Sequence, residues 1–322
     1  MTPGNPLVSI VIPVYNGSDY LREAIDSALA QTYSPCEVVV VNDGSTDHGA
    51  TETVALKYGS KIRYFSKPNG GVASALNRGI EEMKGEYFSW LSHDDLYCPD
   101  KIEVEMKLLS GKPAGSIAFS DYRFIDENGR PLETVRFTKV SRNSLQELLI
   151  AEASIHGCTL LIPAACFREA GRFDEQRLTT QDFYLWYAFS KVFAFFNAPE
   201  VTVQSRVHAQ QGSRTMSSIA KKEHNEYRFW AIRQFSQDNN GGDLAFRLAR
   251  IAVRLKIVGC EEESRFAADC SRQARRGHSL LLRPVTLLVL AYRLLWPRKL
   301  MFGYVKSYVR SLITRMSRPR LG

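Results

Sequence analysis

Two adjacent carboxylates, Asp94 and Asp95, directly follow a short apolar stretch over residues 87–91 that is rich in aromatic side chains. Its length and composition predict a buried strand, and in a parallel sheet ligands gather beyond the carboxyl ends of the strands. A pair of acids at such an end suits a hard divalent cation, which can keep several waters and also bind substrate phosphates. The alternative is that Asp94 only caps the helix expected to start near Pro99.

Polar residues also end two other predicted strands. Residues 7–14 and 37–41 are nearly continuous apolar runs, as expected of strands covered on both faces. The first leads into Tyr15 and Asn16, and the second into Asp43. Because the carboxyl ends of parallel strands meet at one edge, we expect these side chains and the acid pair to border a nucleotide-sized cleft.

Strand and helix patterns alternate through the first hundred residues. Apolar stripes at helical spacing cover residues 21–29 and 72–83, and a further strand is expected over 62–65. This alternation predicts the α/β class, with a doubly wound, mostly parallel sheet and right-handed crossovers. The sequence has neither a GxGxxG nor a GxxxxGK[ST] motif, which argues against a Rossmann dehydrogenase or a P-loop NTPase.

Later elements are read from the same patterns. Strands are expected over 116–125, 156–162 and 192–203, helices over 144–150 and 183–189, and a polar loop over 204–214. From about residue 217 the pattern is helical, with helices expected over 217–237, 243–258 and 261–276.

Composition indicates an ordinary folded protein of the cytoplasm. Of the 322 residues, 44% are hydrophobic and 24% charged. The six cysteines form no CxxC pair, so we interpret them as reduced thiols. The N-terminus lacks the basic and apolar regions of a signal peptide.

The net charge of +8 is unevenly distributed. Residues 270–322 contain 12 Lys/Arg and no acid, whereas residues 1–269 have a net charge of −4. The tail over about 279–322 includes a basic amphipathic pattern at 299–316, typical of helices that lie on anionic membranes. No uncharged run there is long enough to span a bilayer, which predicts peripheral attachment to the inner face of the plasma membrane. A helix hairpin packed on the protein, or an oligomer contact, is the alternative.

Several short motifs occur in a fixed order: residues 12–16 (IPVYN), 41–47 (VNDGSTD), 69–71 (NGG) with 75–79 (ALNRG), 93–95 (HDD), and Asp182. Together they make residues 1–215 resemble a family 2 glycosyltransferase with the GT-A fold. The resemblance implies an inverting enzyme that moves a sugar from a nucleotide diphosphate to an acceptor hydroxyl. Residues 216–322 lie outside it and are expected to form a helical C-terminal region.

The resemblance also implies how the donor is bound. Asp43 would accept a hydrogen bond from the imide N–H of uracil or thymine, which favours a UDP- or dTDP-sugar. Alternatively, Asp43 only caps the following helix and the two glycines only form a tight turn. The other residues expected to bind the nucleotide sugar are Pro13, Tyr15, Asn16, Gly70, Gly71 and Asn77.

For the cation, Mg²⁺ or Mn²⁺, the resemblance implies Asp95 as a direct ligand, with Asp94 on the donor sugar or ribose. Many members of the family have Asp-x-Asp-Asp, whereas this chain has Ser92 at the first position, which leaves the number of ligands open. His208 is a further candidate ligand, and its imidazole would suit Mn²⁺ better than Mg²⁺. The alternative is that His208 has only a structural role. Arg214 is expected to clamp the diphosphate, unless it is only a solvated surface residue.

Asp182 is implied as the catalytic base, and here Gln181 replaces the Glu of the Glu-Asp pair that many family members have. It would accept the proton of the attacking hydroxyl; the alternative is a helix N-cap. We expect Asp43, Asp95 and Asp182 to share one pocket.

The expected role is cell-surface polysaccharide or lipopolysaccharide synthesis with a saccharide or lipid-linked acceptor. One alternative is a sugar-nucleotide nucleotidyltransferase, which usually has a Gly-rich basic loop where this chain has Tyr15-Asn16-Gly17. The other is a non-enzymatic protein that binds anionic surfaces. Nucleic acid is not expected, because the basic charge lies in an apolar segment.

Overall fold

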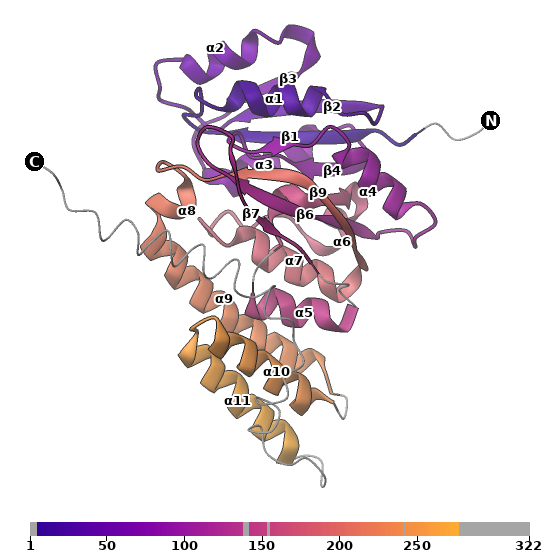
Figure 1. The fold of residues 1–322 in the computed structure, drawn as a ribbon, viewed down its shortest axis with the longest axis vertical. Coiled ribbons are helices and arrows are strands. Elements are labelled where there is room, and N and C mark those ends of the chain that lie inside the picture. Colours follow the sequence, from indigo (N-terminus) through magenta and orange to yellow (C-terminus); the bar gives the residue numbers. More distant parts are fainter. Residues whose placement is uncertain (1–4, 138–141, 153–154, 241–242, 277–322) are drawn as a thin grey trace, which may run out of the picture.

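The structure is a computed structural model that describes residues 5–137, 142–152, 155–240 and 243–276. Its sheet lies at one end of the molecule and a group of helices at the other (Figure 1). The predicted tail over 279–322 lies outside the described residues. No helix among those described is long and apolar enough to cross a bilayer.

The N-terminal half of the sheet is parallel. The central strand β1 (Val8–Val14) pairs with β2 (Cys36–Asn42) on one side and β4 (Tyr87–Trp90) on the other, and β3 (Arg63–Ser66) pairs with β2. Every residue of β1 is buried, as its continuous apolar run predicts. The connecting helices are α1 (Leu21–Leu29), α2 (Ala50–Leu56), followed by the short η1 (Gly59–Lys61), and α3 (Gly71–Glu82). The predicted α/β unit is therefore confirmed.

The rest of the sheet is mixed. β8 (Leu160–Pro163) is antiparallel to both β4 and β6 (Ile117–Ile125), while β9 (Phe195–Arg206) runs parallel to β6. Two strands that the sequence did not predict, β5 (Leu96–Tyr97) and β7 (Pro131–Val135), pair antiparallel with β9 and β6. The strand order is β3-β2-β1-β4-β8-β6-β9-β5, with β7 beside β6.

Helices complete the sheet-bearing part. They are α4 (Lys101–Leu109), α5 (Arg142–Ala151), η2 (Gly157–Thr159), α6 (Ala164–Ala170) and α7 (Gln181–Val192). The prediction of a continuous polar loop over 204–214 was wrong at both ends. Gln204 to Arg206 extend β9, where they pair with β6, and α8 (Gly212–Thr215) forms a single helical turn.

Three helices follow, as predicted: α9 (Ser217–Asp238), α10 (Leu244–Ile257) and α11 (Glu261–Arg276). They bury a hydrophobic cluster that includes Tyr227 and Leu248, and Ile150 of α5 and Tyr187 of α7 belong to the same cluster. Figure 1 shows α5 and α7 between the sheet and these helices. The helical part is thus packed on the sheet-bearing part, and the domain boundary at 215/216 stays a prediction.

Candidate functional site

The carboxyl ends of β1, β2 and β4 lie at one edge of the sheet, because the three strands are parallel neighbours. The backbone N–H of Asp43 donates to the carbonyl of Val14 at 2.8 Å, and that of Leu91 to Val11 at 3.0 Å, so the ladder continues to this edge. The expected gathering of three polar strand ends is therefore present.

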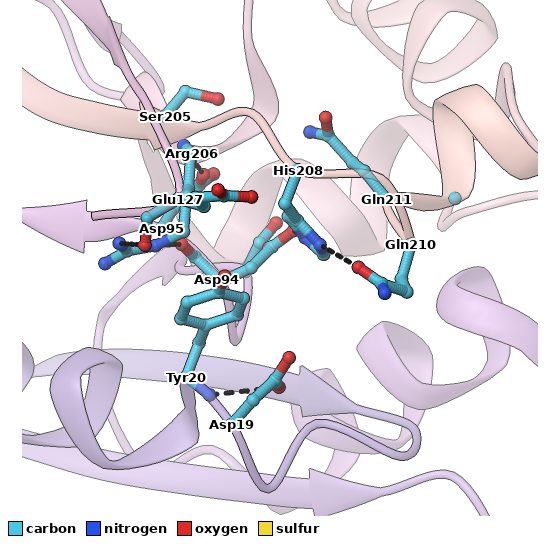
Figure 2. Close-up of polar contacts among 12 residues, drawn as sticks. Asp19, Tyr20, Asp94, Asp95, Glu127, Ser205, Arg206, His208, Gln210 and Gln211 are labelled. Carbon is cyan, nitrogen blue, oxygen red and sulfur yellow. Dashed lines mark hydrogen bonds and ion pairs between the residues drawn. The ribbon is translucent and has the colours of Figure 1, made fainter. Parts of the chain in front are cut away.

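Asp94 pairs with His208, which lies two residues beyond β9. The Asp94 Oδ2 and His208 Nε2 atoms are 3.0 Å apart, and the ring of Tyr20 lies 5.1 Å from that of His208 (Figure 2). The hydrogen bond to Asp94 raises the pKa of His208 against the effect of burial. Burial opposes ionisation of Asp94, but the hydrogen bond from His208 and the charge of His93 outweigh it and lower the pKa of Asp94. Asp94 does not cap α4, whose N-cap position is Asp100.

Asp95 is held by protein donors on both oxygens. The backbone N–H of Arg206 donates to Oδ1 at 2.9 Å, and the Cys158 thiol donates to Oδ2 at 3.4 Å. His156 Nε2 lies 3.6 Å from the same Oδ2 atom. Burial and then the charge of Asp94 raise the pKa of Asp95 to about 8.

Arg206 organises this cluster, although it was not among the residues predicted to form the site. Its side chain is fully buried. The guanidinium donates to the Asp94 carbonyl at 3.0 Å, to the Glu127 carbonyl at 3.0 Å and to the Glu23 carboxylate at 2.7 Å, and it lies 4.4 Å from the centre of the Tyr20 ring. Charged strand residues are almost always solvent-exposed, so only its place two residues before His208 could have drawn attention to it.

Asp43 is buried and accepts hydrogen bonds from three groups. They are Lys67 Nζ at 2.7 Å, the N–H of Gly70 at 3.0 Å and the N–H of Gly71 at 2.7 Å. Asp43 lies directly after β2, and its carboxylate therefore caps the start of α3 across the chain. It does not cap the helix that follows it, α2, whose N-cap position is Gly49.

The residues after β1 have different surroundings. Tyr15 is 45% exposed, so its ring is free to contact a ligand. The amide oxygen of Asn16 accepts from the Thr46 N–H at 2.7 Å, which ties together the loops after β1 and β2. Pro13 pairs within the sheet with Val41 of β2. In this structure Asn16 and Pro13 shape the sheet edge.

Asn77 of α3 fixes a loop that precedes α7. Its amide nitrogen donates to the Phe173 carbonyl at 2.9 Å and to the Glu175 carboxylate at 2.8 Å. Its oxygen accepts from the Phe173 N–H at 3.1 Å. Both ends of the amide therefore hold the protein's own chain.

Asp182 is the second residue of α7 and is half-buried. Its Oδ1 accepts from the Phe183 N–H at 3.0 Å, and burial raises the pKa of Asp182 to about 7. Among the described contacts, none joins Asp182 to Asp43, Asp94 or Asp95. The pocket that Asp43, Asp95 and Asp182 are expected to share therefore stays a prediction. The backbone of Arg214 belongs to α8, but its side chain lies outside the described part of the structure.

The acid pair fits a divalent cation. Two carboxylates are buried next to each other, and a nearby cation would favour the ionised form of both. His208 adds an imidazole to Asp94, and His156 and Cys158 add a second imidazole and a thiol to Asp95. The ligand atoms of Asp95, His156 and Cys158 lie within 4.8 Å of one another.

Comparison with known proteins links these features to one family. Residues 9–165 match the model of "Glycosyl transferase family 2". An uncharacterized glycosyltransferase of Rickettsia typhi, RT0329, is 51% identical over 66% of this chain and 67% of its own length. A second one, from Rickettsia felis, is 51% identical over 69% of this chain, but the chain spans only 36% of that protein. The hyaluronan synthase of Pasteurella multocida is 32% identical over 68% of this chain and 22% of its own length.

Solved structures share the fold. TarS 1-349 of S. aureus in complex with UDP has a TM-score of 0.53 at 16% identity, covering 86% of this chain and 94% of its own. The mannosyltransferase PcManGT from Pyrobaculum calidifontis, in complex with GDP-Man and Mn²⁺, has a TM-score of 0.55 at 17% identity, covering 97% and 87%. These likenesses confirm the expected GT-A fold class with a helical C-terminal region.

Proposed function

Because the chain belongs to glycosyltransferase family 2, we propose that it is an inverting glycosyltransferase. It would move a sugar from a UDP- or dTDP-sugar to an acceptor hydroxyl. The observation that carries this proposal is the buried Asp94–Asp95 pair with His208, at the same sheet edge as Asp43. The chain spans about a third of the length of several relatives it matches, so the proposal concerns this chain alone.

For the donor, the solved structures of similar fold were obtained with UDP or GDP-Man. Tyr15 is exposed at the end of β1 and would lie against the base. Asp43 would accept from the imide N–H of uracil or thymine, and for this it would share or release one of its present donors. Of these three donors, only Lys67 donates from a flexible side chain, so it is the donor that would move. Gly70 and Gly71, at the start of α3, and Asn77 on the same helix would border the donor.

For the cation, Mg²⁺ or Mn²⁺, we propose Asp94 and His208 as the residues that hold it. Their facing atoms are 3.0 Å apart, close enough to bind one ion. Asp95, the ligand expected from the resemblance, has a protein donor on each oxygen, so a positioning role also fits it. A bound cation would neutralise the diphosphate as it gains charge.

Asp182 would act as the base. The acceptor oxygen forms a bond to the anomeric carbon as the bond from that carbon to the diphosphate breaks, and the nucleoside diphosphate leaves with the electron pair. Asp182 takes the proton of the acceptor hydroxyl. A carboxylate with a pKa of about 7 is well matched to this task near neutral pH, and one positioned base typically contributes about 10²–10⁴-fold.

The acceptor is proposed to be a saccharide or a lipid-linked saccharide of a cell-surface polysaccharide or lipopolysaccharide. The enzyme would then work at the cytoplasmic face of the plasma membrane, attached through the basic tail. We expect a variant without residues 279–322 to lose binding to anionic liposomes in a sedimentation assay, with neutral liposomes as control. Equal binding of the two proteins to anionic liposomes would contradict the attachment.

The proposed activity is tested by release of nucleoside diphosphate from a panel of UDP-, dTDP- and GDP-sugars with Mg²⁺, Mn²⁺ or EDTA. We expect turnover of a uridine or thymidine donor, loss of turnover with EDTA, and loss of at least about 10²-fold in transfer for Asp182→Asn with donor binding intact. Pyrophosphate formation from a nucleoside triphosphate and a sugar phosphate would instead indicate a nucleotidyltransferase. Failure of every nucleotide sugar to be turned over would contradict glycosyl transfer.

A further inference from the structure

The segment over residues 173–180, which leads to the proposed base, is held at both of its ends. At the first end, Asn77 of α3 binds Phe173 and Glu175. At the second end, the holding group comes from the helical C-terminal part. That group is the carboxylate of Glu223 in α9, and Glu223 is only 8% exposed.

Glu223 accepts hydrogen bonds from three consecutive residues. Its Oε1 accepts from the Leu178 N–H at 3.0 Å. Its Oε2 accepts from the N–H and the hydroxyl of Thr179, at 2.9 and 2.7 Å, and from the hydroxyl of Thr180 at 3.2 Å. Burial opposes the ionised form of Glu223. The hydrogen bonds from these donors outweigh burial, so the pKa of Glu223 is lowered.

The result is that α7 begins without its usual side-chain cap. Thr180 occupies the N-cap position, but its hydroxyl donates to Glu223 and makes no cap hydrogen bond to α7. The helix start is thus placed by a carboxylate from another helix. Asp182 follows two residues later, so its position depends on where Glu223 holds Thr180.

We infer that Glu223 is a positioning residue for Asp182, and that α9 thereby sets the geometry of transfer. The inference rests on the proposed function, in which Asp182 is the base. A positioning error of about 1 Å can cost about 10²-fold in rate. Loss of this contact should therefore slow transfer, while the residues proposed to bind the donor, which all lie outside the segment over 173–180, keep their positions.

Glu223→Gln is the principal variant, because it removes the charge and presents an N–H group to donors. We expect kcat for transfer to fall about 10- to 100-fold, with the donor KM within about twofold of wild type. Glu226→Gln is the matched control: Glu226 lies on the same helix and binds Arg177 of the same loop through a partly exposed ion pair. Since such exposed ion pairs contribute little to stability, Glu226→Gln should keep its kcat within about twofold of wild type.

A double-mutant cycle separates positioning through Asp182 from a general structural effect. In an Asp182→Asn background, Glu223→Gln should change the residual rate by less than about threefold, because the group it positions is already disabled. If Glu223→Gln does not fold, Thr179→Val, which loses the hydroxyl, is compared with Thr179→Ser, which keeps it; only the first should lower kcat.

Any of three results would overturn the inference. Glu223→Gln could leave kcat unchanged, it could raise the donor KM by the same factor by which kcat falls, or it could cause the same loss of rate in the Asp182→Asn background as in wild type. An equal loss in Glu226→Gln would do the same. Failure of the proposed function looks different: wild-type protein would turn over no nucleotide sugar, or Asp182→Asn would transfer as fast as wild type.

Discussion

Asp94 and His208 are 114 positions apart, and each favours the charged form of the other. The hydrogen bond between them lowers the pKa of Asp94 and raises the pKa of His208. A cation that replaced the shared proton would find a carboxylate and a neutral imidazole facing it, a donor set that suits Mn²⁺. Asp95, one residue on, is instead bound by the chain around it.

This difference predicts separate effects for the two acids. Asp94→Asn and His208→Ala should each raise the Mn²⁺ concentration needed for half-maximal turnover by at least about tenfold, because each removes a ligand. Asp95→Asn should change the Mn²⁺ requirement less and lower the free energy of unfolding more. Metal titration of activity together with chemical denaturation measures both. The reverse order would support Asp95 as the direct ligand.

The proposed role of Asp182 as the base predicts how transfer depends on pH. Burial raises the pKa of Asp182 to about 7, so the carboxylate is largely protonated below that pH and cannot accept a proton. We expect kcat at saturating substrates to be level above about pH 7 and to fall about tenfold per pH unit below it. A kcat that stays constant down to pH 5 would show that Asp182 is not the base.

At the scale of elements, α3 packs directly against β1 through a glycine. A Cβ on Gly79 would lie 2.2 Å from Val11 Cγ1 of β1, so only glycine allows this approach. The same helix carries Asn77 toward Phe173 and begins at the glycines that bind Asp43. Its distance from β1 therefore affects both ends of the predicted donor site.

Gly79→Ala should destabilise the protein by about 1–2 kcal/mol. Overpacking a buried contact costs about 1–3 kcal/mol, and the higher helix propensity of alanine offsets up to about 1 kcal/mol. Urea denaturation gives the difference. As a control, Val11→Ala should cost less in the Gly79→Ala chain than in wild type, because it removes the clash; equal costs would show that the two residues do not interact.

At the scale of the whole molecule, buried charge connects the helical part to the sheet-bearing part. Glu147 of α5 is fully buried and accepts from Arg247 Nε at 3.2 Å and from Arg250 Nε at 2.9 Å, both in α10. Together with Glu223, it joins the C-terminal helices to the part of the chain that carries the proposed site.

Glu147→Gln should lower the free energy of unfolding by about 3 kcal/mol. Removing one partner of a buried ion pair typically costs about 3–5 kcal/mol, and the lower end applies because the Arg250 side chain is 30% exposed. Glu226→Gln, which removes an ion pair with higher exposure, should cost less than about 1 kcal/mol. If both variants lose the same small amount, Glu147 does not stabilise the packing of α10 on α5.

Local patterns were enough to predict much of this fold. The buried run of β1, the helical stripes of α1 and α3 and the three C-terminal helices follow from apolar periodicity, which reports burial directly. Strands β5 and β7 were missed because the first has two residues and the second is a largely exposed edge. Neither leaves a periodic signal.

The sequence by itself determined the family, the parallel unit and the sheet edge at which Asp43, Asp94 and Asp95 lie, because consecutive strand ends in a parallel sheet must share an edge. Only the tertiary structure decided which groups these acids contact: His208 for Asp94, Arg206 and Cys158 for Asp95, and the start of α3 for Asp43. Glu223 leaves no signal in the local pattern, and Arg206 leaves none beyond its place near His208. A hydrogen bond between residues dozens of positions apart depends on how helices and strands pack. It produces no periodic pattern in the sequence from which it could be predicted.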